Sequence, residues 1–251
     1  MKVLQLAGFK KSGKTALCEE LILKAVKKGL RCAVIKNIHG ELALSGKNDG
    51  ERFLKAGARE VFLRQEGLVD VLKPQAGFMD LIRQSGFQYD LLFVEGFKSL
   101  PLPCIWCMKE NDEVMEKENI LGYFILAEKR SSIIPSRKLP LFSGLREETV
   151  ENLWTLIDVL PPFPAGLDCG LCGKDCVTLY AEMMKNPSCF CPVQKEEKDV
   201  DVSINGKTLA LMPFVRKLLR ETVKGFLGEL KGYEDGTIHI TVYQKTKEEK
   251  K

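Results

Sequence analysis

The sequence lacks several features that would assign it to a familiar class of protein. Its 251 residues hold no apolar run near the roughly 20 that span a membrane, and Met1 to Ala7 lead into a glycine-rich motif instead of a signal peptide. Basic and acidic residues nearly balance, 38 against 34, so a net charge of +4 gives no electrostatic case for nucleic acid. We therefore expect a cytoplasmic protein with no membrane and no nucleic-acid partner.

What the sequence does contain is a phosphate-binding loop near its N-terminus. Residues 8–15 read G-F-K-K-S-G-K-T and fit G-x-x-x-x-G-K-[ST] at every fixed position, between an apolar strand pattern and a helical pattern. Such a loop points backbone N–H groups and a helix N-terminus at phosphate oxygens. The residues predicted to bind nucleotide are Gly8, Lys11, Ser12, Gly13, Lys14, Thr15 and Ala16.

Three side chains carry the chemistry expected of this loop. Lys14 is expected to pair with the β- and γ-phosphates, and the Thr15 hydroxyl to bind Mg²⁺. Glu95 ends the apolar run 91–94 beside a glycine, which predicts an acidic residue of the magnesium shell at a strand tip. Lys98 follows and can add charge near phosphate.

The fold predicted for the first 160 residues is a mostly parallel sheet covered by helices on both faces. Apolar, β-rich runs predict strands over residues 31–36, 61–64, 90–95, 104–108 and 122–127. Helical patterns alternate with them over residues 15–28, 50–56, 75–85 and 147–160. This alternation is typical of α/β proteins, here of the P-loop NTPase type.

A proline cluster at residues 161–164 divides the chain, since three prolines in four positions cannot continue a helix. We predict a P-loop domain over residues 1–162, a cysteine-rich module over 163–195 and a small α+β unit over 196–251. In the last unit we expect a hairpin around Asn205-Gly206, a helix from Pro213 to Leu230 and a strand from Thr237 to Tyr243.

Several motifs in the first 160 residues resemble the molybdopterin-guanine dinucleotide biosynthesis protein B (MobB) family in their order. They are the P-loop, Ile35-Lys36, the loop 46–49 with Arg52 and residues 56–58, and Val94-Glu95-Gly96-Phe97-Lys98. The resemblance implies a GTP-binding P-loop protein with weak GTPase activity that assists the enzyme joining GMP to molybdopterin.

By the same resemblance, Lys14 and Thr15 are phosphate and Mg²⁺ groups, and Glu95 is the acid of the magnesium shell. Asp49 and Arg52 belong to the loop beside the nucleotide. The expected partner is a molybdopterin guanylyltransferase or a molybdoenzyme, and P-loops of this type often work as dimers. The choice of GTP over ATP rests on the resemblance, because no late Asn-Lys-x-Asp motif is present.

Five of the nine cysteines fall within 23 residues, which indicates a metal site in a cytoplasmic chain. Cys169, Cys172 and Cys176 lie on a glycine-rich stretch, and Cys191 precedes a proline. The pattern resembles the four-cysteine [4Fe-4S] domain of corrinoid iron–sulfur proteins, in which the last ligand precedes proline. Cys191 is therefore the favoured fourth ligand and Cys189 its alternative.

Zinc is the alternative metal, but its sites more often use two C-x-x-C pairs of similar spacing. The second C-x-x-C of this chain, Cys104 to Cys107, lies in an apolar run where cysteine packs as a small hydrophobic side chain.

Two functions remain open at this point. The first is a GTP-binding adaptor in molybdenum-cofactor biosynthesis that carries the cluster as a structural or redox-sensing module. The second is a nucleotide-gated iron–sulfur electron carrier that serves a metallocofactor or a partner enzyme.

Overall fold

A six-stranded parallel sheet forms the centre of the computed structural model, which describes residues 1–37, 61–65, 68–72, 77–85, 88–127, 139–195, 200–204, 207–234 and 236–242. The strand order is β2-β5-β1-β6-β7-β8. These strands are β1 (Lys2–Gly8), β2 (Cys32–Lys36), β5 (Leu91–Glu95), β6 (Cys104–Met108), β7 (Ile120–Ile125) and β8 (Leu141–Ser143). The central β1 carries the P-loop at its carboxyl end.

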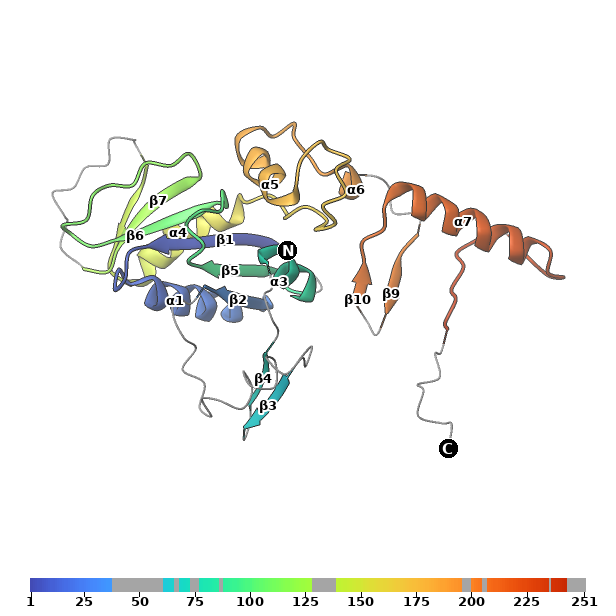
Figure 1. Ribbon diagram of the computed structural model, residues 1–251, viewed down its shortest axis with the longest axis horizontal. Coiled ribbons are helices and arrows are strands. Elements are labelled where there is room, and N and C mark those ends of the chain that lie inside the picture. The colour runs from blue at the N-terminus through green and yellow to red at the C-terminus, as the bar shows by residue number, and fades with distance from the viewer. Residues whose placement is uncertain are drawn as a thin grey trace.

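Helices cover both faces of this sheet, as the sequence predicted (Figure 1). On one face α1 (Lys14–Lys27) and α4 (Glu147–Asp158) pack against Leu4 and Leu6 of β1. On the other face α3 (Phe78–Ser85) and α5 (Cys176–Lys185) share a core with Val3. Alternate residues of β1 thus point to opposite layers, and both faces are apolar because both are covered.

One predicted strand lies outside the parallel sheet. Residues 61–64 belong to β3 (Val61–Gln65), which pairs antiparallel with β4 (Leu68–Leu72) in a separate two-stranded sheet. The sequence analysis missed β4, and also β8, which has only three residues. A strand pattern shows which residues are extended but not which strand they pair with. The prediction for residues 61–64 is therefore right about the strand and wrong about its place in the parallel sheet. The helix expected over 50–56 lies outside the described residues.

The C-terminal unit contains the predicted hairpin and helix. β9 (Val202–Ile204) pairs antiparallel with β10 (Lys207–Leu209), and α7 (Pro213–Gly228) begins with a proline at a position that needs no N–H donor. Figure 1 shows these elements away from the parallel sheet. The strand predicted from Thr237 is wrong over residues 237–242, which form no strand and leave Ile240 and Val242 exposed.

No helix in the described ranges is both long and apolar enough to cross a membrane.

The cysteine-rich segment is packed directly onto the P-loop domain. Phe163, Val177 and Tyr180 join Val3 in one buried cluster, and a short helix, α6 (Pro192–Lys195), follows the last cysteine. The Tyr180 hydroxyl accepts a hydrogen bond from the Val3 amide (3.1 Å) and donates one to the Val3 carbonyl (2.9 Å). β1 pairs with β6 only from Gln5 onward, so this hydroxyl satisfies the backbone at the start of β1.

We predict that Tyr180→Phe destabilises the protein, because it leaves the buried N–H and C=O of Val3 without their partner. The expected loss is about 1–3 kcal/mol of unfolding free energy, the cost of unsatisfied buried polar groups. Urea unfolding followed by circular dichroism measures it. Tyr89→Phe is the matched control, since Tyr89 is only partly buried, and an equal change in both variants would contradict the prediction.

Candidate functional site

The P-loop has the backbone geometry that its two glycines predict. Gly8 has φ 151°, and a Cβ there would lie 1.9 Å from the carbonyl oxygen of Cys107 on β6. Gly13 has φ 84°, a left-handed conformation that favours glycine, and it forms the N-cap of α1. The loop therefore curls tightly against the sheet and turns directly into the helix.

The N-terminus of α1 is ready to bind an anion. No side chain caps the helix, and the N–H groups of its first residues, Lys14, Thr15 and Ala16, have no acceptors within the helix. These amides, together with the helix dipole, favour a phosphate group at this position. Ser12, also predicted to bind nucleotide, is buried beside them, with 2% of its surface exposed.

The Lys14 side chain folds back over the loop. Its Nζ donates to the carbonyl oxygen of Phe9 (2.5 Å) and lies 3.4 Å from Ser12 Oγ. Burial lowers the pKa of Lys14 from its ordinary value, with the Glu95 carboxylate among the groups that oppose the shift. A bound phosphate would favour the ammonium form, so the lysine is placed to gain from an anionic ligand.

Thr15 and Glu95 meet at the carboxyl edge of the sheet, although 80 residues separate them. The Thr15 hydroxyl lies 3.2 and 3.1 Å from the two Glu95 carboxylate oxygens, and Glu95 is only 7% exposed. A hydroxyl and a carboxylate are the oxygen ligands that Mg²⁺ takes beside nucleotide phosphates. The expected pairing of these two residues at the magnesium shell therefore fits the geometry.

Lys36 completes this group, and the sequence analysis gave it no role. Its Nζ lies 3.2 Å from each carboxylate oxygen of Glu95 and 3.3 Å from Thr15 Oγ1. Lys36 ends β2 in register with Glu95 at the end of β5. The available signal was a charged residue at the end of a β-rich run, the same signal that identified Glu95.

Lys98 lies beside the P-loop, where its ammonium group contacts two aromatic rings. Its Nζ is 4.5 Å from the ring centroid of Phe9 and 5.9 Å from that of Trp106. This cation–π contact keeps a positive charge next to the P-loop, on the side facing β6. Two other predicted residues, Asp49 and Arg52, lie outside the described residues.

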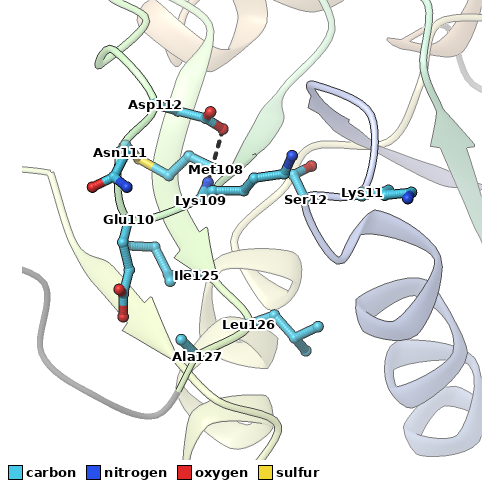
Figure 2. Close-up of a pocket in the computed structure, with 10 residues that line it drawn as sticks. All are labelled: Lys11, Ser12, Met108, Lys109, Glu110, Asn111, Asp112, Ile125, Leu126 and Ala127. Carbon is cyan, nitrogen blue, oxygen red and sulfur yellow. Dashed lines mark hydrogen bonds between the residues drawn. The ribbon is translucent and has the colours of Figure 1, made fainter.

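A cavity of about 340 Å³ opens next to the P-loop (Figure 2). It lies between the loop and the carboxyl ends of β6 and β7, and its lining residues are Lys11, Ser12, Met108, Lys109, Glu110, Asn111, Asp112, Ile125, Leu126 and Ala127. Asp112 accepts a hydrogen bond from the Lys109 amide (2.8 Å), which fixes the turn after β6. The volume is that of a small-ligand site, and its rim is polar.

The cysteine-rich loop lies before α5 and is held from two sides. Asp175 caps the helix by accepting from the amides of Val177 and Thr178 (2.9 Å each). Asp168 accepts from the Cys176 amide and from Arg83 of α3, both at 2.8 Å. These contacts anchor the loop to the P-loop domain.

The thiols of this region divide between two packing clusters. Cys169, Cys172, Cys189 and Cys191 pack around Leu179. Cys176 packs with Val3 instead, and burial raises its pKa to about 11. Among the described residues, no three side chains of His, Cys, Asp or Glu meet in an arrangement that could hold a metal ion. By ligand type, however, thiol groups suit an iron–sulfur centre better than a hard cation.

The other C-x-x-C pair is structural, as predicted. Cys104 packs on one face of the sheet and Cys107 on the other, and both are at most 1% exposed. Burial raises the pKa of Cys104 to about 12, and it also raises the pKa of Cys107. These thiols are therefore neutral and unreactive.

Comparison with known proteins agrees with the P-loop geometry. Residues 3–124 match the model of the MobB family, described as molybdopterin guanine dinucleotide synthesis protein B. The P-loop domain is therefore similar to the MobB family. The crystal structure of Bacillus subtilis MobB covers 62% of this chain and 98% of its own, with a TM-score of 0.52 and 24% identity, a likeness that concerns the fold alone.

Two proteins are similar to this chain in sequence. A putative molybdopterin-guanine dinucleotide biosynthesis adapter protein of Methanocaldococcus jannaschii is 25% identical over 240 residues, which cover 94% of each chain. A probable adapter protein of the same name from Bacillus subtilis is 28% identical over 149 residues, 56% of this chain and 84% of its own. The relative from Methanocaldococcus jannaschii is therefore similar over nearly the whole length, beyond residues 3–124.

We predict that Glu95→Gln weakens the Mg²⁺ dependence of nucleotide binding, because an amide is a poorer ligand than a carboxylate. Removing one charged partner costs about 1.5–3 kcal/mol, so Mg²⁺ should enhance nucleotide affinity about 10- to 100-fold less than in the unmodified protein. Titration calorimetry with and without EDTA measures this. Glu148→Gln, an exposed site in α4, is the control, and an undiminished Mg²⁺ effect in Glu95→Gln would refute the assignment.

Proposed function

We propose that this protein is a GTP-binding adapter in the biosynthesis of molybdopterin guanine dinucleotide. The observation that carries the proposal is the contact of Thr15 with Glu95 beside an uncapped helix N-terminus, within a MobB-family domain. These groups support the binding of a triphosphate and its Mg²⁺. The names of the relatives, which are adapter proteins of this pathway, supply the biological context.

In this proposal the bound nucleotide controls a partner enzyme. The partner is a molybdopterin guanylyltransferase or a molybdoenzyme, and the protein acts in the cytoplasm, as a homodimer. Lys14 and Glu95 also support a slow, Mg²⁺-dependent GTPase, with Lys14 on the phosphates and Glu95 in the magnesium shell. A slow rate suits a switch, because the bound state must persist long enough for a partner to respond.

Titration calorimetry in the presence of Mg²⁺ tests the nucleotide. We expect GTP to bind more tightly than ATP, and Lys14→Met to weaken GTP binding about 10- to 100-fold, because a charge-assisted hydrogen bond to phosphate is lost. Lys27→Met, an exposed lysine in the last turn of α1, is the control with the same loss of charge. Tight ATP binding without GTP binding would overturn the proposal.

We further propose that Cys169, Cys172, Cys176 and Cys191 hold a [4Fe-4S] cluster. Gly170 and Gly173 have positive φ values of 72° and 75° with open space around them, so their backbone can approach cluster sulfurs. Three of the four thiols already share one packing cluster. Cys176, in the first turn of α5, would have to turn its side chain away from Val3 to join them, and Cys189 is the alternative ligand.

Anaerobic purification with iron and sulfide analysis tests this cluster. We expect equal amounts of iron and sulfide, and we expect Cys191→Ser to lose both, whereas Cys189→Ser keeps them. Zinc without sulfide would contradict the proposal. A reduction potential that changes on GTP addition would favour the electron-carrier function, for which the bond between Tyr180 and the P-loop strand provides a physical link.

A further inference from the structure

Lys36 reaches the magnesium-shell residues from a strand that the P-loop motif does not include. β2 runs parallel to β5 with Lys36 opposite Glu95, and the Asn37 amide donates to the Glu95 carbonyl (2.9 Å). The backbone of Lys36 is therefore fixed at the edge of the sheet. Its side chain is 46% exposed, so its four-carbon stem is free to change direction at little packing cost.

The ammonium group stands where a cation between Thr15 and Glu95 is expected. It lies 3.2 Å from both carboxylate oxygens and 3.3 Å from the threonine hydroxyl. Mg²⁺ takes its oxygen ligands at about 2.0–2.1 Å, and it cannot share these same oxygens with an ammonium group in this position. Mg²⁺ bound by Thr15 and Glu95 would therefore displace the Lys36 side chain.

The displaced ammonium has a nearby anion only when a triphosphate is bound. Mg²⁺ held by Thr15 and Glu95 would accompany the phosphates of a bound triphosphate, so a γ-phosphate would lie near the position that the lysine leaves. Lys14 approaches the phosphates from the P-loop, where Phe9 and Ser12 hold it. Lys36 approaches from β2, and a nucleoside diphosphate offers no γ-phosphate on that side.

We propose that Lys36 is a γ-phosphate sensor. Without nucleotide it neutralises the buried Glu95 carboxylate, and with Mg²⁺ and a triphosphate it gives up that position and pairs with the γ-phosphate. This role rests on the proposed nucleotide binding and deepens it. Its consequence is discrimination between triphosphate and diphosphate by a residue outside the P-loop.

Binding measurements on Lys36→Met test the sensor. In the presence of Mg²⁺ we expect the ratio of GTP to GDP affinity to fall about 10- to 100-fold, because only GTP loses a contact of its γ-phosphate. Lys36→Arg keeps a cation and should lose less GTP affinity. Lys28→Met, whose lysine lies over Trp154 at the far end of α1, is the matched control and should change neither affinity.

A second readout needs no nucleotide. Mn²⁺ titration followed by electron paramagnetic resonance should show tighter metal binding in Lys36→Met, because no ammonium competes for Thr15 and Glu95. Urea unfolding of each variant checks that the fold is retained. Equal losses of GTP and GDP affinity, or no loss of either, would overturn the sensor, as would unchanged or weaker Mn²⁺ binding.

The same samples separate this inference from the proposed function. If the unmodified protein binds ATP and ADP but not GTP, the adapter proposal fails. The sensor is then tested by the ratio of ATP to ADP affinity in Lys36→Met. If it binds GTP and Lys36→Met does not alter the ratio of GTP to GDP affinity, only the sensor fails. If it binds no nucleotide, both fail.

Discussion

The placement of β1 between β5 and β6 is the constraint on which the rest of the structure depends. Pairing with β5 puts Leu6 opposite Glu95, and pairing with β6 puts Gly8 opposite Cys107. The first register brings the carboxylate beside Thr15, and the second presses the P-loop backbone so close to β6 that only glycine fits at position 8. A shift of either strand would separate the residues that carry the proposed chemistry.

Charge balance at this edge explains why Lys36 belongs to the site. Glu95 is almost fully buried, and a buried carboxylate without a partner is strongly unfavourable. Lys36 and the Thr15 hydroxyl satisfy it in the nucleotide-free protein. In the proposed complex, Mg²⁺ bound with the nucleotide would replace Lys36 beside Glu95, and binding at the P-loop would then change the contacts of β2.

The sequence predicted those parts of the site that depend on local pattern. The P-loop conformation follows from Gly8, Gly13 and the helix after them, and Glu95 follows from its position at the end of an apolar strand. Lys36 needed the register of β2 with β5, which is a property of the sheet. For the same reason the pairing of β3 with β4 was not predictable. The strand expected from Thr237 failed in a similar way, because its local sequence does not show whether a partner strand lies beside it.

The proline cluster interrupts the secondary structure but not the core. Phe163 and Tyr180 lie beyond it and are buried with Val3, and the Tyr180 hydroxyl occupies the edge of β1 that β6 leaves unpaired. Arg83 of α3 also pairs with Asp168 at the base of the cysteine-rich loop. Any movement of α5, which begins at Cys176, relative to the P-loop would have to break the buried hydrogen bonds between Tyr180 and β1, the strand that ends at the phosphate site. A cluster bound here would thus be rigidly coupled to the P-loop strand, and nucleotide could act on it through β1 without displacing the module as a whole.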